Sequence, residues 1–295
     1  MKKKTIPLNN GETLAYIERN PQAKQTILLI HGNMSSGVHY KPLIEELKQE
    51  YHLVVPDLRG FGDSTYHKPI ETLEDFADDL YRFLDEISVD AAHVVGWSTG
   101  GGVALKFAAK YPHRTETVSL IESASYRGYP IFEKDENFKP TEKLYVSKEA
   151  MANDPVQVAP PQKALENKDK PFMKKIWDQL IFNVKQPEEN DYACYLEETL
   201  KQRNLIDVDW ALMTFNMSHT QNGVVPGDAS IDEVQAPVLS IYGTKDLVIL
   251  KTMFEETVSA LPNATPYIID GGSHAPLTDD PQLIADLIVT HINTN

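Results

Sequence analysis

This chain is poor in cysteine, in basic side chains and in long apolar runs. Cys194 is the only cysteine among 295 residues, which excludes an intramolecular disulfide and a metal site built from several thiolates. Lysine and arginine number 28 against 43 aspartates and glutamates, and the net charge of −15 disfavours binding to nucleic acid and to anionic membranes. Apolar runs such as 27–30 extend over only a few residues, too few to span a bilayer. These absences favour a globular protein with a small-molecule substrate and no membrane or nucleic-acid partner; no feature indicates an oligomeric state.

The start of the chain also lacks a targeting signal. The lysines at 2–4 resemble the basic part of a secretory signal, but no apolar stretch follows them. We therefore expect a cytoplasmic protein whose first residues form an exposed, frayed end.

The first part of the chain alternates short apolar runs with amphipathic segments. Strand-like runs lie at 13–18, 26–31, 51–56, 92–95 and 117–121, and helix-like segments lie at 42–49, 73–87 and 99–110. This alternation predicts an α/β fold with a mostly parallel central sheet covered by helices on both faces.

The alternation stops after about residue 125. The next hundred or so residues are polar and contain several prolines, and they are mainly helical where they have a pattern, with no strand-like run of comparable strength. Helical patterns lie at 172–182, 192–200 and 210–217, and after them come strand-like runs at 237–242 and 265–269 with helices at 251–261 and 281–292. The sequence therefore predicts an α/β core over 1–126 and 233–295, interrupted by a helical cap over 127–232.

The segment 94–102 contains the pattern Gly-x-Ser-x-Gly with Ser98 at its centre. An apolar run precedes it and a helical pattern follows it, which is the sequence form of a strand, a sharp turn and a helix with a serine at the apex. Gly96 and Gly100 suit such a turn, because its strained backbone leaves no room for side chains on either side. The pattern predicts that Ser98 is the nucleophile of a serine hydrolase.

A serine hydroxyl needs a base within hydrogen-bond reach and an acid that orients the base. Asp246 and His274 each lie in a loop after a strand-like run, in the order expected after Ser98. Because the carboxyl ends of parallel strands meet at one edge of a sheet, we expect these three residues to converge there. Asp270 and Glu122 are the alternative acids, the first close to His274 in sequence and the second at the end of the strand after the elbow helix.

An acyl-transfer site also needs two backbone N–H groups that bind the oxyanion. We expect them from Thr99, next to the nucleophile, and from Asn33, which follows a His-Gly pair at the end of a strand-like run. Met34, Trp97 and Glu122 are the side chains that we expect to contact the substrate. Large side chains in or beside the expected cap either line an acyl pocket or pack within the cap, and these are Tyr126, Tyr129, Trp177, Phe182, Trp210, Phe215 and Met217.

Together these motifs resemble the α/β-hydrolase superfamily. The resemblance rests on 31–33, 57–64, the elbow around Ser98 and the loops of Asp246 and His274. It implies the α/β-hydrolase fold, a Ser-Asp-His triad and a lid that sets substrate choice, with no metal ion and no organic cofactor. Haloalkane dehalogenases and epoxide hydrolases carry an aspartate where this chain has its serine, which argues against both. The Asn-Met-Ser-Ser loop and the elbow tryptophan are most similar to esterases and lactonases of small substrates.

The sequence thus predicts a carboxylesterase-like serine hydrolase that cleaves a carboxylic ester, with a lactone or an acyl thioester as variants of that substrate. Two other hypotheses stay open. A carbon–carbon bond hydrolase, or another triad-based chemistry, would use the same fold and residues. A non-catalytic receptor would bind a small ligand at the same place.

Overall fold

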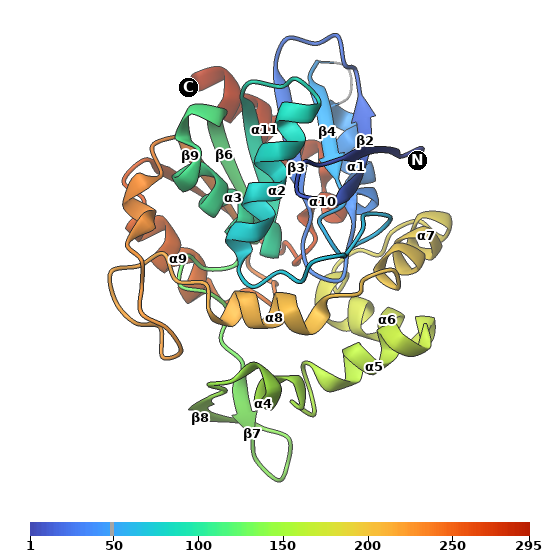
Figure 1. Cartoon of the computed structure of the whole chain (residues 1–295), viewed down its shortest axis with the longest axis vertical. Coiled ribbons are helices and arrows are strands. Elements are labelled where there is room, and N and C mark those ends of the chain that lie inside the picture. The colour runs from blue at the N-terminus through green and yellow to red at the C-terminus, as the bar shows by residue number, and fades with distance from the viewer. Residues whose placement is uncertain (48–49) are drawn as a thin grey trace.

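The computed structural model describes residues 1–47 and 50–295, and its main feature is an eight-stranded sheet in the order β1-β2-β4-β3-β5-β6-β9-β10 (Figure 1). From β4 to β10 the neighbouring strands run parallel, whereas β1 pairs antiparallel with β2 and β2 antiparallel with β4. The strands are β1 (Lys4–Pro7), β2 (Thr13–Arg19), β3 (Thr26–Ile30), β4 (His52–Pro56), β5 (Ala92–Trp97), β6 (Thr115–Ile121), β9 (Val238–Gly243) and β10 (Ala264–Ile269). The mostly parallel sheet that the sequence predicts is confirmed.

Helices cover both faces of this sheet, also as predicted. Helices α2 (Leu73–Glu86) and α3 (Thr99–Lys110) pack on one face, and α1 (Lys41–Leu47) and α11 (Pro281–Thr294) pack on the other (Figure 1). On α2 the buried apolar side chains recur at helical spacing, and they include Leu73, Phe76, Leu80, Phe83 and Leu84. The other helical segments outside the middle of the chain are η1 (Gly37–Tyr40), η2 (Pro112–Arg114), α9 (Lys251–Ala260) and α10 (Pro276–Asp279).

The parallel register brings the carboxyl ends of neighbouring strands side by side. Ile30, the last residue of β3, pairs with Gly96 of β5, and Ile121, the last residue of β6, pairs with Ile241 of β9. The loops that follow β3, β5, β6, β9 and β10 therefore leave the sheet at one edge, which is where ligands bind in open α/β sheets.

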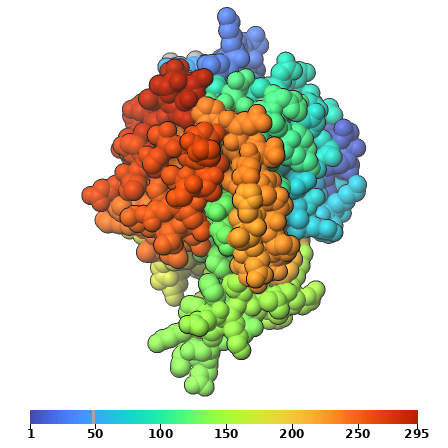
Figure 2. Space-filling view, turned by 90° about the vertical axis from the view of Figure 1, so that its left-hand side faces the viewer, coloured from blue at the N-terminus to red at the C-terminus, as the bar shows by residue number. Residues whose placement is uncertain are grey.

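Most of the elements between β6 and β9 lie at one end of the sheet, whereas the last of them packs against α3 (Figure 1). The elements are β7 (Phe132–Lys134), β8 (Pro140–Leu144), α4 (Lys148–Ala152), α5 (Ala159–Asn167), α6 (Lys170–Ile176), η3 (Trp177–Ile181), α7 (Glu189–Thr199), α8 (Leu205–Met213) and η4 (Ser230–Glu233). The light-green part of this segment projects from the surface in Figure 2. We expected no strand here, and the antiparallel hairpin of β7 and β8 corrects that expectation. Its short strands are largely exposed, so they lack the apolar alternation that marks a half-buried strand.

The chain end also differs from the exposed, frayed end that we expected. Residues 4–7 pair with β2, and the Lys3 ammonium lies 2.6 Å from both Asp57 Oδ2 and Glu198 Oε2. These two carboxylates are almost fully shielded from water. An ammonium that reaches buried carboxylates satisfies their charge, so the start of the chain is tied to the core and to α7.

Several predicted helices differ at their ends. Residues 48 and 49, at the end of the helix expected over 42–49, lie outside the described residues. The helix expected over 172–182 is α6 followed by a π-helical turn, η3. The helix expected over 210–217 is α8, which begins and ends earlier. In the part of the chain that the structure describes, no helix is both long and apolar enough to cross a membrane.

Candidate active site

Ser98 lies at the sharp turn between β5 and α3, with φ of 57° and ψ of −123°. This left-handed conformation costs of the order of 1–3 kcal/mol and persists only where its surroundings enforce it. The Ser98 N–H donates to Ile121 O at 3.0 Å, and Ser98 O accepts from Ala124 N at 3.0 Å. A Cβ on Gly96 would lie 2.3 Å from the Gly100 carbonyl oxygen, and one on Gly100 would lie 2.1 Å from Ile30 O. The two glycines are therefore required for the turn, and the turn presents the serine at the carboxyl edge of the sheet.

A cavity of about 380 Å³ lies at this edge, and Ser98 and His274 both line it. Among the described residues no hydrogen bond joins the two side chains; such bonds often form only when substrate binds. The rest of the wall is mostly apolar and comes from the loops of the core and from the segment that contains α5, α6 and α8. The cavity has the size and lining of a small-molecule site.

His274 and Asp246 are in direct contact, as we expected from their loops. The two atoms His274 Nδ1 and Asp246 Oδ2 lie 2.7 Å apart in a buried pair. The other carboxylate oxygen accepts from the N–H groups of Val248 at 2.6 Å and Ile249 at 3.0 Å. Burial alone raises the pKa of Asp246, but the His274 ring and these hydrogen bonds outweigh burial and hold the pKa below its ordinary value. An ionised Asp246 accepts the Nδ1–H of His274, so Nε2 is left as the proton acceptor.

Glu122 lies behind Asp246 and is not among the residues that line the cavity. Its Oε1 accepts the Gly243 N–H at 2.6 Å, and its pKa is raised well above the ordinary value by burial and by the neighbouring Asp246 charge. Glu122 therefore does not line this cavity, because its side chain is held at the sheet edge by Gly243, and the expectation that it contacts substrate stays a prediction. The other alternative acid, Asp270, is exposed and accepts from Thr244 Oγ1 at 3.2 Å.

Asn33 and Thr99, the expected oxyanion donors, both line the cavity beside Ser98. Thr99 is the first residue of α3, so its N–H has no carbonyl partner within the helix. The loop of Asn33 approaches closely, because a Cβ on Gly32 would lie 2.9 Å from Ser98 Cβ. The next residue, Met34, lines the cavity with φ of 52°, a strained conformation for a residue with a side chain. The two residues of the predicted donors thus line the same cavity as Ser98.

Two residues of the middle segment hold this loop, and the sequence analysis missed both. Gln202 Nε2 donates to Asn33 Oδ1 at 2.8 Å, and Gln202 Oε1 accepts the Met34 N–H at 2.9 Å. Asn33 Nδ2 donates to Asp209 Oδ1 at 2.9 Å. Burial raises the pKa of Asp209 to about 7. No local motif surrounds Gln202 or Asp209, so the sequence carries no signal that points to them.

The family relationship is clear from the sequence as a whole. Residues 25–281 match the sequence model of the family described as "alpha/beta hydrolase fold". The chain belongs to the α/β-hydrolase family.

The chain is similar to a lipase in sequence and to solved hydrolases in fold. Lipase 1 from Psychrobacter immobilis is 24% identical over 290 residues, which cover 96% of this chain and 81% of the lipase. An esterase from Exiguobacterium antarcticum has a TM-score of 0.75 at 14% identity, covering 99% of this chain and 100% of the esterase. The enol-lactonase from Burkholderia xenovorans LB400 has a TM-score of 0.74 at 16% identity, covering 98% and 100%. The two solved structures show the fold alone.

Few of the large side chains proposed for an acyl pocket reach the cavity of this α/β hydrolase. Trp97, expected to contact substrate, lines the cavity, and its Nε1 donates to the His274 carbonyl oxygen at 2.7 Å. Tyr129 and Trp177 also line it, whereas the other candidates near the cap pack elsewhere, and these are Tyr126, Phe182, Trp210, Phe215 and Met217. Trp97 therefore contributes both to the wall and to the position of His274.

One carboxylate cluster of this α/β hydrolase has the spacing of a cation site. Asp57, Asp63 and Glu198 offer oxygens within 4.8 Å of one another. The Lys3 ammonium lies 2.6 Å, 3.0 Å and 2.6 Å from these three carboxylates. The lysine already supplies the positive charge that the cluster needs, so we assign no metal to it.

Proposed function

We propose that this protein is a serine hydrolase that cleaves carboxylic esters through an acyl-enzyme on Ser98. The observation that carries the proposal is the buried 2.7 Å contact between His274 Nδ1 and Asp246 Oδ2 at the wall of the cavity that Ser98 also lines. A non-catalytic receptor would not need an ionised acid behind the histidine, since binding alone does not require a base.

The proposed first step is the attack of Ser98 Oγ on the ester carbonyl. His274 Nε2 takes the hydroxyl proton, and Asp246 stabilises the imidazolium that forms. The tetrahedral intermediate collapses when the C–O bond to the alcohol breaks and His274 returns the proton to the leaving oxygen. A water molecule then attacks the acyl-enzyme, with His274 again as the base, and the carboxylic acid leaves.

The proposed oxyanion donors are the backbone N–H groups of Asn33 and Thr99. Both residues line the cavity next to Ser98, and Thr99 stands at a helix N-terminus, where the helix dipole favours negative charge. Preorganised donors of this kind contribute more than any other single group in many acyl-transfer enzymes.

We further propose that 127–232 acts as a cap that sets substrate choice. Side chains from this range, among them Ile131, Trp177 and Leu212, form a large part of the mostly apolar wall. A wall of this kind favours a small ester with an apolar part, and an intramolecular ester, a lactone, presents the same carbonyl. We also propose that the protein acts on such small molecules in the cytoplasm.

The proposal is tested with p-nitrophenyl esters from acetate to laurate and with a fluorophosphonate probe. Ser98→Ala should lose both hydrolysis and labelling while it keeps the wild-type melting temperature, and Ser259→Ala, an exposed serine on α9, should keep both. If the probe labels Ser98 but no ester is hydrolysed, Ser98 is reactive and the substrate is a lactone or a compound with a cleavable carbon–carbon bond rather than a simple ester. Hydrolysis that persists in Ser98→Ala would overturn it.

A further inference from the structure

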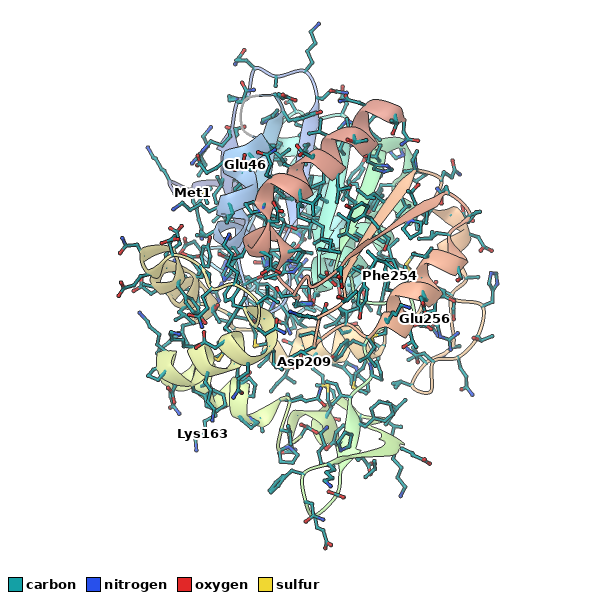
Figure 3. The ribbon with its side chains drawn as sticks, turned by 180° about the vertical axis from the view of Figure 1, so that it is seen from behind. Met1, Glu46, Lys163, Asp209, Phe254 and Glu256 are labelled. Atoms are coloured by element: carbon teal, nitrogen blue, oxygen red, sulfur yellow. The ribbon has the colours of Figure 1, made fainter. Side chains whose placement is uncertain are left out.

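Asp209 is a buried carboxyl group in the wall of the cavity. It belongs to α8 and is 9% exposed, and Figure 3 labels it between the sheet and the helices at the end of the sheet. It is the one carboxyl group among the described residues of the wall, whose other titratable side chains are His274 and Tyr129. An acid in an apolar wall needs a partner, because burying a polar group without one is unfavourable.

The carboxyl group of Asp209 has only part of the hydrogen bonding that such a group needs. Oδ1 accepts from Asn33 Nδ2 at 2.9 Å, and within the described residues no donor reaches Oδ2. Other buried carboxylates of this chain differ in how fully they are satisfied. Asp79 accepts two bonds from Arg59 and one from Asn10. Glu122 Oε2 and Asp279 Oδ1 also have no partner among the described residues, but neither residue lines the cavity. Asp209 does line it, so its missing partner is expected there.

We propose that Asp209 is a specificity residue that binds a hydroxyl group on the acyl part of the substrate. This inference rests on the proposed function and names the class of ester: the ester or lactone of a hydroxy acid. The hydroxyl group would donate to Oδ2, the carboxyl oxygen that the protein leaves without a partner.

The position of Asp209 indicates which part of the substrate carries the hydroxyl group. Asn33 binds Asp209 through its side chain, and its backbone N–H is a proposed oxyanion donor. The same residue, Asn33, would thus bind the Asp209 carboxyl group through its side chain and the carbonyl oxygen of a bound ester through its backbone. This proximity points to a hydroxyl group on one of the first carbons of the acyl chain rather than at its far end.

A hydroxyl group suits this carboxyl better than a cation does. Burial raises the pKa of Asp209 to about 7, so the neutral and the ionised forms are both present near neutral pH. A hydroxyl group donates to the ionised form and accepts from the O–H of the neutral one, whereas an ammonium group cannot accept that O–H and is attracted by charge only to the ionised form. A site with a buried polar group of this kind discriminates strongly against a substrate that lacks the matching hydroxyl group.

The test compares ethyl butyrate with the two enantiomers of ethyl 3-hydroxybutyrate, which differ from it only by the hydroxyl group, and measures ethanol release. In the wild type, kcat/KM for one enantiomer should exceed that for ethyl butyrate by about ten- to a hundredfold, the range of a hydrogen bond to a charged group. Asp209→Leu should bring this ratio to about one. Loss of the bond to Asn33 lowers the rates with both esters alike, so the ratio is the measurement that reports the specificity role. Asp209→Ala is the second variant, for use if leucine disturbs the packing of α8.

Three variants separate the specificity role of Asp209 from a role in holding the Asn33 loop, from a general effect of acids on α8, and from the proposed catalysis by Ser98. Gln202→Ala disturbs the Asn33 loop without removing the carboxyl group, so it should lower both rates and keep the ratio. Asp207→Asn changes an acid of the same helix that binds Tyr66 and Lys148, and it should keep both rates. Ser98→Ala tests the proposed function alone. A wild type without preference, or an Asp209→Leu variant that slows both esters equally, would overturn the specificity role even if hydrolysis depends on Ser98.

Discussion

Gln202 forms two hydrogen bonds with the loop that follows β3, through its amide nitrogen to Asn33 Oδ1 at 2.8 Å and through its amide oxygen from the Met34 N–H at 2.9 Å. Gln202 and Asn33 are 169 residues apart in the chain. The loop carries a proposed oxyanion donor and a strained residue, Met34, with φ of 52°. The segment between β6 and β9 therefore contributes to the geometry of the site as well as to the walls of the cavity.

The first prediction concerns this contact. Gln202→Ala should lower kcat roughly three- to thirtyfold, less than the loss of an oxyanion donor, because the donor stays but is held less firmly. KM should change less than kcat, since the apolar wall is intact. Steady-state kinetics with p-nitrophenyl butyrate measure both. Gln186→Ala, an exposed glutamine bound to Asp178, is the control, and an unchanged kcat in Gln202→Ala would contradict the role.

The second prediction separates the two acids behind His274. Asp246→Asn should lower kcat by roughly 10³- to 10⁴-fold, because the amide favours the wrong tautomer of the histidine. Glu122→Gln should change kcat less than threefold, because burial and the Asp246 charge raise the pKa of Glu122 and so favour its neutral form, and glutamine has the same shape. The pH profile of kcat/KM for both variants is the measurement. A tenfold loss in Glu122→Gln would mean that its charge takes part.

The third prediction concerns the pH dependence of stability. Asp209 is protonated in the folded protein up to about pH 7, whereas in the unfolded chain it ionises near its ordinary value of 3.8. Between these values the unfolded chain binds fewer protons, so this group makes the free energy of unfolding fall as the pH rises. The Asp154 charge adds to the raised pKa, and the bond from Asn33 opposes it.

Asp209→Asn should therefore gain stability over the wild type as the pH rises. The difference in unfolding free energy should grow by roughly 2–3 kcal/mol between pH 5 and pH 8. Most of this change falls over the roughly two pH units below the folded pKa, at about 1.4 kcal/mol for each unit. Urea denaturation at four pH values measures it. Asp209→Leu removes the same charge and should follow the same trend even if its absolute stability differs. A difference that does not vary with pH would show that Asp209 is ionised throughout.

The fourth prediction concerns the elbow. Gly100→Ala would put a Cβ 2.1 Å from the Ile30 carbonyl oxygen, and backbone atoms of β3 have little freedom to move. We expect a loss of roughly 3 kcal/mol or more in unfolding free energy, or no folded protein. Gly11→Ala is the matched control, since Gly11 has φ of 92° but open space around its Cβ position, and its cost should be about 1 kcal/mol. Equal costs for both would contradict the steric role.

The strands of the core and the elbow were accessible from the sequence because their signals are local. The run at 117–121, for example, predicts most of β6, and the Gly-x-Ser-x-Gly pattern predicts a turn that only glycine allows beside Ser98. Local reasoning was wrong where a partner came from elsewhere. From the sequence, Lys3 is expected at an exposed chain end, but in the fold it forms ion pairs with Asp57 and Glu198. The β7–β8 hairpin was not predicted, because its strands lack the alternation of apolar and polar residues.

The sequence by itself determined most strands and helices of the core, the strained turn at Ser98, and the loops in which Asp246 and His274 stand. Each of these depends on steric or periodic rules that act within a few residues. Only the tertiary structure decided that Glu122 faces the sheet edge rather than the cavity, and that Asp209 binds Asn33 across 176 residues of chain. Such contacts depend on how distant segments pack, and packing leaves no pattern in the sequence beside either residue.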